Sequence, residues 1–297
     1  MYRRAFNSRV GSIRLYSTRT STVWVMTDGG LESTLQAMTL GKQLSPNVTL
    51  KHVVASKKLQ VFPVIIQKYL VNFKKNKNDQ KLPWYLTDKQ ESHQDNSVPD
   101  YIITSGQDAV PASIHYTDLF KKAFSVYLGY PNIPFINFDQ VVLPKYLANA
   151  KMAALGPLAR QKNGIITPTP LLDPTLPVKI PSNDGYTSVI IGGHLPECKW
   201  YSEDGINLAD TIKRMVTHLN DRVNVVFTER TPGIVKEKFT KRIETLPDPS
   251  TVTIWDSTKA ENIQEKIDKY EEIIQNSKRV VVTADLDYAS AHAVANR

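Results

Sequence analysis

The sequence predicts an α/β protein of two doubly wound, Rossmann-like domains that face each other. Short apolar runs, typical of buried parallel strands, alternate with segments of helical periodicity along nearly the whole chain. Two of these runs lead directly into paired glycines, Gly29-Gly30 and Gly192-Gly193. Five prolines between Ile166 and Gly185 interrupt the alternation, because proline cannot continue a helix or a central strand. This segment therefore predicts the boundary between the domains.

The composition is that of an ordinary folded protein, with 41% hydrophobic and 22% charged residues among 297. No apolar run approaches the roughly 18 residues of a membrane-spanning helix, so we expect no transmembrane segment. The single cysteine, Cys198, excludes a disulfide within this chain and a cysteine-based zinc site, and no metal is expected. Four arginines in the first sixteen residues supply half of the net charge of +8. The other basic runs lack interleaved aromatic residues, so we predict no nucleic-acid binding.

The first 21 residues have the composition of a mitochondrial transit peptide, with five arginines, frequent serines and no carboxylate. Phe6, Val10 and Ile13 would share one face of a helix. Arg14-Leu15-Tyr16-Ser17 resembles the arginine-minus-three site of the matrix processing peptidase. Residues 1–16 are therefore predicted to be a cleaved presequence, and the mature protein to lie in the mitochondrial matrix. A disordered basic tail is the alternative.

Residues 22–165 are expected to form the first domain. Strands are expected over 23–26, 51–54, 101–104, 133–138, 140–143 and 164–167, and helices over a segment that begins at 31, over 61–73 and over 109–127. Asp28 ends the first strand, and it could cap the following helix or act as a general base. Gly29, Gly30 and Gly106 follow strands and allow a ligand to approach the backbone closely, although each also fits an ordinary turn of such a sheet.

Residues 186–297 are expected to form the second domain, joined to the first by the proline-rich linker 166–185. Strands are expected over 189–191, 222–227, 252–256 and 280–283, and helices over 208–219, 234–242, 263–274 and from 284 onward. Gly192-Gly193, between a strand and a helix, could offer backbone N–H groups to a phosphate, or could be an ordinary turn. His194 beside them could act as a base, or could simply be solvated.

Several short motifs occur in the order and spacing of a known family. They are Val23-Trp24-Val25 with Thr27-Asp28-Gly29, Pro99-Asp100-Tyr101-Ile102-Ile103 with Gly106, Ile190-Ile191-Gly192-Gly193, Arg230-Thr231-Pro232, Ile254-Trp255-Asp256 and Val282-Thr283-Ala284-Asp285. From about Val23 to Ala293 the chain resembles the elongated-mitochondria type of mitochondrial fission factor, known from plants and with many bacterial relatives. That family is similar in organisation to two-domain glycosyltransferases of the B type. The resemblance implies a ligand cleft between the domains and, as the ligand, a nucleotide-sugar or a nucleotide diphosphate.

By analogy with those transferases, the loops after the strands of the second domain would line the ligand site. Glycines there would approach a diphosphate, and the arginine would offer a bidentate fork to phosphate. The second-domain residues that the analogy places at the ligand are Gly192, Gly193, Thr228, Arg230, Thr231, Thr283 and Asp285. A surface salt bridge is the alternative role for Arg230, and a helix N-cap is the alternative role for Asp285.

Three features depart from the family pattern. Leu286 and His292 stand where the family usually has a serine and a glutamate of the type that holds a ribose. Lys145-Tyr146-Leu147 stands where a basic residue and His-Asp often occur, so the histidine base is missing. The sequence stops at Arg297 inside the helix after the last strand, so the second domain is expected to be truncated.

We therefore expect a non-catalytic mitochondrial protein that acts in mitochondrial fission or organisation through protein contacts. The resemblance implies a dynamin-related partner, but a matrix presequence would separate the chain from a partner on the outer mitochondrial surface. A nucleotide-sugar-dependent glycosyltransferase and a nucleotide-binding regulator without turnover are the alternatives.

Overall fold

The structure is a computed structural model that describes residues 20–73, 82–89, 97–155, 161–173, 185–195 and 199–295. The predicted presequence, Cys198 and residues 174–184 of the predicted linker lie outside these residues. In the part of the chain that is described, no helix combines the length and the apolar character needed to cross a bilayer.

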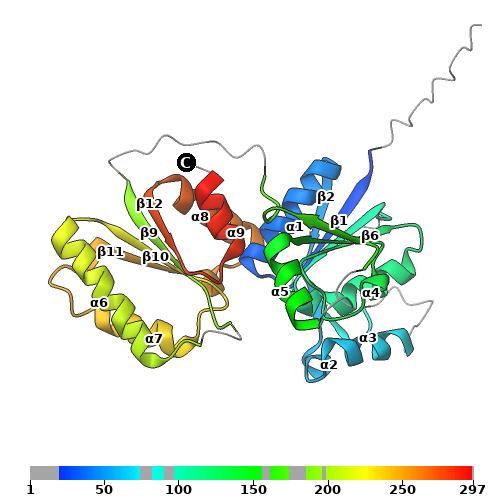
Figure 1. The fold of residues 1–297 in the computed structure, drawn as a ribbon, viewed down its shortest axis with the longest axis horizontal. Helices are drawn as coiled ribbons and strands as arrows, with labels where there is room; N and C mark the ends of the chain where they lie inside the picture. The colour runs from blue at the N-terminus through cyan, green and yellow to red at the C-terminus, as the bar shows by residue number, and fades with distance from the viewer. Residues whose placement is uncertain are drawn as a thin grey trace, which may run out of the picture.

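Six parallel strands form the first sheet, in the order β2-β1-β5-β6-β7-β8 (Figure 1). They are β1 (Thr22–Thr27), β2 (Asn47–Lys51), β5 (Tyr101–Ser105), β6 (Phe124–Leu128), β7 (Gln140–Pro144) and β8 (Gly164–Thr167). Alternate side chains of the central strands pack on opposite faces, with Val25 toward α1 (Leu31–Leu44) and Met26 toward α4 (Val110–Leu119) and α5 (Lys145–Leu155). Helices therefore cover both faces, which explains the continuous apolar runs of these strands.

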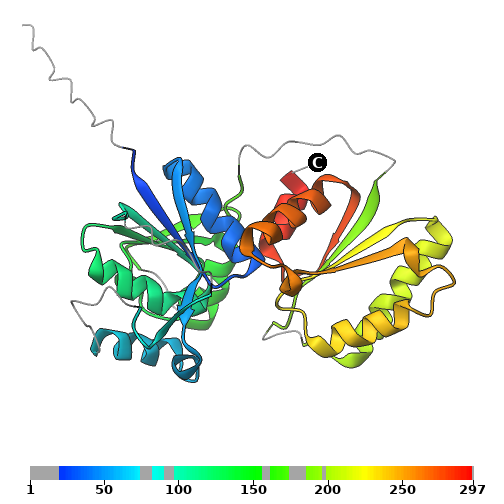
Figure 2. The same ribbon diagram turned by 180° about the vertical axis from the view of Figure 1, so that it is seen from behind.

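A smaller layer lies on the outer side of α4. It consists of the antiparallel pair β3 (Val53–Ala55) and β4 (Leu86–Asp88), the short helix α2 (Lys57–Gln60) and α3 (Val64–Phe73). In Figures 1 and 2, α4 lies between α3 and the sheet. Helix α3 thus packs mainly on α4.

The second sheet has four parallel strands in the order β11-β10-β9-β12. They are β9 (Tyr186–Ile191), β10 (Val223–Phe227), β11 (Val252–Asp256) and β12 (Ser277–Val282). Helices α6 (Ser202–Leu219) and α7 (Gly233–Ile243) pack on one face, and α8 (Ile263–Gln275) and α9 (Asp287–Ala295) pack on the other. The predicted architecture of two doubly wound, Rossmann-like units is confirmed.

Helix α1 joins the two units. Leu31 and Leu35 of α1 are buried in the same apolar cluster as Ile267 and Tyr270 of α8 and Leu286 beside α9. Figure 2 shows α1 lying against α8 at the centre of the molecule. The two sheets therefore meet through a continuous core, and the carboxyl ends of their strands point toward the same region.

Three expectations for the first unit were wrong, and one helix was not expected. The helix expected over 109–127 ends at Leu119, and Phe124–Leu128 form a strand between β5 and β7. Residues 133–138 form no strand, because Pro134 lacks the N–H that a ladder needs and Phe135–Asn137 form a 3-10 turn. The strand expected over 51–54 is divided at His52 between β2 and β3. Helix α5 was not expected, because its small residues give little helical periodicity.

Candidate functional site

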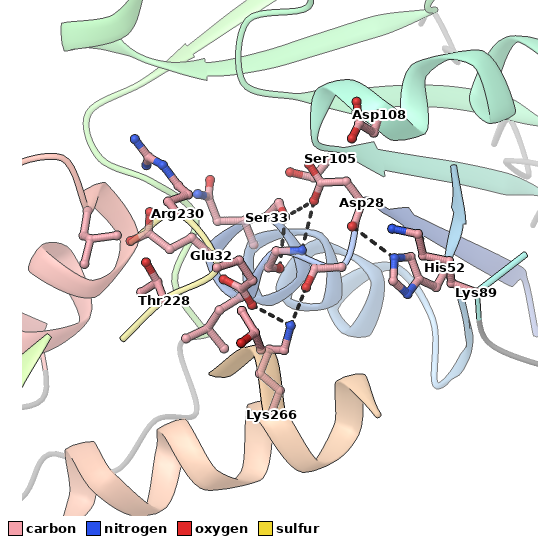
Figure 3. A pocket seen from close by; sticks show the side chains of 17 residues that line it. Asp28, Glu32, Ser33, His52, Lys89, Ser105, Asp108, Thr228, Arg230 and Lys266 are labelled. Carbon is pink, nitrogen blue, oxygen red and sulfur yellow. Dashed lines mark hydrogen bonds and ion pairs between the residues drawn. The ribbon is translucent and has the colours of Figure 1, made fainter. Parts of the chain in front are cut away.

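The candidate site lies where both sheets reverse their strand order. In the first sheet, the chain connections leave β1 and β5 in opposite directions. In the second sheet, β9 connects to β10 on one side, and the chain returns from β11 to β12 on the other side of β9. In open α/β sheets such a point opens a crevice beyond the carboxyl ends of the strands, and ligands bind there. The loops at these ends, with α8, enclose a pocket of about 560 Å³ (Figure 3).

On the first sheet, the loop after β1 is built around the Asp28 carboxylate. This carboxylate accepts hydrogen bonds from the Ser33 hydroxyl, at 2.7 Å, and from the Gly30 N–H, at 3.1 Å. A Cβ atom at Gly106, which follows β5 with a φ of +91°, would lie 2.0 Å from Asp28 Oδ2. Glycine at this position therefore lets the carboxylate sit against the neighbouring loop. Burial is the main cause that raises the pKa of Asp28.

His52 closes this side of the pocket. Its Nε2 lies 3.0 Å from the Asp28 carbonyl oxygen, and its ring packs on Gly29, where a Cβ atom would lie within 2.5 Å of the ring. Burial lowers the pKa of His52. The neutral imidazole can donate to that carbonyl, so the ring holds the loop rather than the carboxylate of Asp28.

On the second sheet, the two glycines after β9 already have partners for their N–H groups. The Gly192 N–H donates to Thr283 Oγ1 at 2.8 Å, and the Gly193 N–H donates to Asp285 Oδ2 at 2.7 Å. The Thr283 hydroxyl in turn donates to Asp285 Oδ1 at 2.6 Å. A Cβ atom at Gly192 would lie 2.0 Å from Asp285 Oδ2. The buried Asp285 carboxylate thus occupies the place of an anion at this turn.

Arg230 completes this arrangement. Its guanidinium pairs with Asp285 Oδ2 at 3.3 Å and donates to the Asp285 carbonyl at 3.1 Å. The arginine side chain is 44% exposed and borders the pocket, whereas its carboxylate partner is buried. The hydroxyls of Thr228 and Thr231 donate to the Ile191 carbonyl, at 2.9 and 2.6 Å, and so hold the loop after β10 against β9.

Lys266 connects the second unit to the first. Its ammonium group extends from α8 and donates to the Gly29 carbonyl at 2.8 Å and to Glu229 Oε1 at 2.5 Å (Figure 3). The lysine side chain is buried, and Lys266, Gly29 and Glu229 all line the pocket. Sequence reasoning missed this residue. The available signal was a lysine inside the apolar stripe that Ile263, Ile267 and Tyr270 form on α8.

Glu32 makes a second connection between the units, from α1 of the first unit to α9 of the second. From the first turn of α1 its Oε1 accepts the Ala289 N–H at 2.9 Å, which satisfies a free donor at the start of α9. Burial raises the pKa of Glu32 to about 7. This residue was also missed, because an acid in the first turn of a helix is common.

The pocket wall carries charges of both signs. Asp28, Glu32, Asp108 and Glu229 supply carboxylates, and Lys89, Lys266 and Arg230 supply cations. Such a wall suits a polar ligand with several hydrogen-bonding groups. Among the residues that the structure describes, no cluster of His, Cys, Asp or Glu could hold a metal ion.

The structure separates the predicted site residues into two groups. Asp28, Gly29, Gly30, Thr228 and Arg230 line the pocket. The others lie behind the lining or outside it, namely Gly106, Gly192, Gly193, His194, Thr231, Thr283 and Asp285. The His194 side chain is exposed, and its Nδ1 accepts the Trp200 N–H at 2.9 Å.

The two positions that depart from the family pattern, Leu286 and His292, lie in different places relative to the pocket. Leu286 is buried and borders the pocket. His292 lies in the core, with its Nδ1 3.1 Å from the Tyr270 hydroxyl.

A sequence model described as mitochondrial fission ELM1 matches residues 33–286. The chain belongs to the mitochondrial fission ELM1 family. The resemblance drawn from the short motifs is thereby confirmed, and it associates the chain with mitochondria and with their fission. The ELM1 match runs from the first turn of α1 to Leu286, so it includes α8 and the loops of the second sheet that line the pocket. The loop after β1, with Asp28 to Gly30, precedes the matched residues.

Two individual proteins are similar to this member of the ELM1 family. The uncharacterized protein RP120 of Rickettsia prowazekii (strain Madrid E) is 22% identical over an alignment of 301 positions, gaps included. The alignment covers 89% of this chain and 77% of the relative. A crystal structure of a candidate UDP-N-acetylglucosamine 2-epimerase from Listeria monocytogenes is 11% identical with a TM-score of 0.40. That superposition covers 89% of this chain and 75% of the epimerase chain.

Proposed function

We propose that this member of the ELM1 family is a non-catalytic mitochondrial factor that acts in mitochondrial fission or organisation through protein contacts. The observation that carries the proposal is the pairing of the Gly192 and Gly193 N–H groups with Thr283 and Asp285. A diphosphate binds at such a turn because free N–H groups and a positive helix end face it. Here a carboxylate of the chain already takes those bonds and also pairs with Arg230.

The surroundings of Asp28 support the same proposal. A general base must reach the proton that it removes. The Asp28 carboxylate instead accepts hydrogen bonds from the Gly30 N–H and from the Ser33 hydroxyl in the first turn of α1. His52 bonds to the backbone of the loop after β1, and His194 is not among the residues that line the pocket.

The pocket itself favours a second candidate, a regulator that binds a nucleotide without turnover. Its volume of about 560 Å³ falls within the range of small-molecule sites, and both units contribute to its wall. A ligand that contacts both units would stabilise their association. Under this candidate the nucleotide would contact the pocket through Arg230 and the loop after β1.

The test is thermal unfolding of the full chain with UDP-, GDP- and ADP-linked sugars and with the free nucleotides, paired with an assay for nucleotide release. The proposal predicts no rise in Tm at millimolar ligand and no turnover, because a ligand that binds only the folded state raises Tm. A rise in Tm without nucleotide release would favour the regulator. A rise with release would overturn the non-catalytic proposal.

The fission role is tested in cells. Deletion of the gene is expected to change mitochondrial morphology, and re-expression of the full chain is expected to restore it. Unchanged morphology after deletion would contradict the role in fission, whatever the pocket binds.

We further propose that residues 1–16 are a cleaved presequence and that the mature chain lies in the matrix. The Arg-rich, acid-free composition of this segment supports the proposal. In protease-protection experiments on intact mitochondria, the mature chain should start after Tyr16 and resist digestion. An uncleaved chain that is digested from outside would contradict this location and would favour the dynamin-related partner that the family resemblance implies.

A further inference from the structure

Helix α3 carries apolar side chains on its outer face as well as on the face that packs on the core. Ile65, Ile66, Tyr69 and Phe73 are all exposed, and their spacing places them along one side of the helix. The opposite, inward side holds Gln67, which is buried and donates to the Phe62 carbonyl at 2.7 Å. The helix therefore turns a polar residue inward and an apolar stripe outward.

The apolar stripe extends into the turn before the helix. Val61 is 80% exposed and Phe62 is also exposed, and Phe62 is held next to α3 by the bond from Gln67. We call the set Val61, Phe62, Ile65, Ile66, Tyr69 and Phe73 the α3 surface. Single exposed apolar residues are normal, whereas a contiguous group marks a binding surface. The inward residues Val64, Leu70 and Val71 pack on the core of the first unit, so the helix is anchored without this surface.

Lysines border the α3 surface. Lys57 and Lys58 are exposed on α2, immediately before it, and Lys68 Nζ lies 5.3 Å from the centre of the Tyr69 ring. Residues 33–78 of the sequence contain no aspartate or glutamate, and the Asp108 carboxylate accepts a hydrogen bond from Gln60 at the end of α2, at 3.3 Å. Apolar and aromatic side chains bordered by lysines are typical of helices that lie in the interface of an anionic bilayer.

We propose that the α3 surface docks the protein on an anionic phospholipid bilayer, with α3 lying flat in the headgroup region. Ten residues of helix give a contact about 15 Å long, and such helices bury their apolar face about 5–10 Å deep. A second copy of the chain fits this surface less well, because a twofold contact would bring the same lysines together. No residue of the α3 surface lines the pocket, and the proposal does not rest on what the pocket binds.

The test measures partition of the full chain onto vesicles of phosphatidylcholine alone and of phosphatidylcholine mixed with phosphatidylglycerol. Binding to the anionic vesicles is expected to exceed binding to neutral ones and to weaken as salt rises. Lys57→Ala/Lys58→Ala should weaken anionic binding about 30-fold, since each lysine near an anionic surface contributes about fivefold. Phe73→Ser should weaken it about tenfold or more, because the buried ring is lost.

Matched controls distinguish binding through the α3 surface from non-specific binding to vesicles. Ile136 is 85% exposed, as is Phe73, but lies elsewhere in the first unit, so Ile136→Ser should leave partition unchanged. The exposed pair Lys121 and Lys122 serves as the charge control in Lys121→Ala/Lys122→Ala. The arginines of the first 21 residues are present in every variant, so differences between variants report the α3 surface alone. Circular dichroism melting checks that each variant is folded.

Three results would overturn the proposal. The first is equal partition of Phe73→Ser and Ile136→Ser, and the second is no preference of the full chain for anionic vesicles. The third is a dimer in sedimentation velocity that Phe73→Ser dissociates, which would make the α3 surface a contact between copies. Each result leaves the fission proposal standing, because that proposal is tested by morphology after gene deletion.

Discussion

At the scale of single residues, carboxylates packed on glycines shape the candidate site. Asp28 lies against Gly106 in the first unit, and Asp285 lies against Gly192 in the second. In each pair the carboxylate follows one strand of the switch point and the glycine follows its neighbour. Each carboxylate fills the space that a side chain at the glycine would occupy. These glycines are therefore required by the packing of the carboxylates.

This packing predicts different costs for two glycine substitutions. Gly106→Ala combines a φ of +91° with a Cβ atom 2.0 Å from Asp28, and should lower the free energy of unfolding by about 3 kcal/mol. Gly129→Ala is the matched control, because it has a φ of +98° and no heavy atom within 4 Å of the new Cβ. It should cost about 1–2 kcal/mol from the backbone alone. Urea unfolding measures both, and equal costs would contradict the contact with Asp28.

Glu32 predicts a pH dependence of stability. Burial raises its pKa to about 7 in the folded chain, above the value of about 4.3 in an unfolded chain. The folded state therefore binds the proton more tightly, and the stability that the protonated group contributes is lost as pH rises from about 4 to 7. Glu32→Gln keeps an acceptor for the Ala289 N–H without the charge. Its stability relative to the native chain should rise by an amount on the order of 3 kcal/mol between pH 4 and pH 8.

Thermal melting of both chains across that pH range measures the effect. Glu237→Gln provides the control, because the exposed Glu237 pairs with Lys241 within one helix and its pKa is lowered by that partner. A difference between Glu32→Gln and the native chain that does not change with pH would show that Glu32 has the same pKa in the folded and unfolded chains, and would contradict the prediction.

The sequence was sufficient to predict some of the residues at the candidate site and insufficient to predict others. Asp28 and the glycines at 29, 30, 192 and 193 stand in strand–glycine–helix patterns, which are local and readable. Lys266 and Glu32 act on partners 237 and 257 positions away in the chain, so their roles depend on how the two units meet. The occupation of the Gly193 N–H by Asp285 likewise depends on strand order within the second sheet.

At the scale of elements, α8 bonds to the first unit through one lysine. Lys266→Met keeps an apolar stem of similar length but removes both bonds of the ammonium group, and leaves the Gly29 carbonyl and Glu229 without this donor. The expected loss in the free energy of unfolding is about 2–3 kcal/mol, because a buried charged hydrogen bond is removed. Lys269→Met on the same helix removes only an exposed pair with Glu272 and should cost less than about 0.5 kcal/mol. Equal effects in urea unfolding would contradict the role of Lys266.

The elements of the second sheet were easier to predict than those of the first. Helices α6 and α8 show a clear apolar stripe, and β9 to β12 are short apolar runs between turn residues. Helix α4 has almost no amphipathic pattern because residues 110–114 are all buried, so the apolar run continued without a visible break into β6. Only the pairing of Phe124–Leu128 with both β5 and β7 decides that this segment is a strand.

At the scale of the whole molecule, the two units share a core instead of meeting across a polar boundary. Thr34 and Ala37 of α1 are buried in the first unit, while Leu31 and Leu35 are buried against α8 and α9. Helix α1 therefore belongs to both cores, and the loop before it forms the floor of the pocket between the units. A change in the contact of α1 with α8 would change the pocket at the same time.

This shared core predicts that a substitution in α1 destabilises helices of the second unit. Leu35→Ala should cost about 3 kcal/mol and leave α8 and α9 packed against a cavity. Local openings of α8 and α9 then become more frequent, so their amides should exchange hydrogen faster. Leu143→Ala is the matched control, because Leu143 is equally buried in a cluster that contains no residue of the second unit. Hydrogen-exchange mass spectrometry should show faster exchange of residues 263–295 in Leu35→Ala alone. Equal protection of those residues in the two variants would mean that the units open independently, and the pocket between them could not then depend on α1.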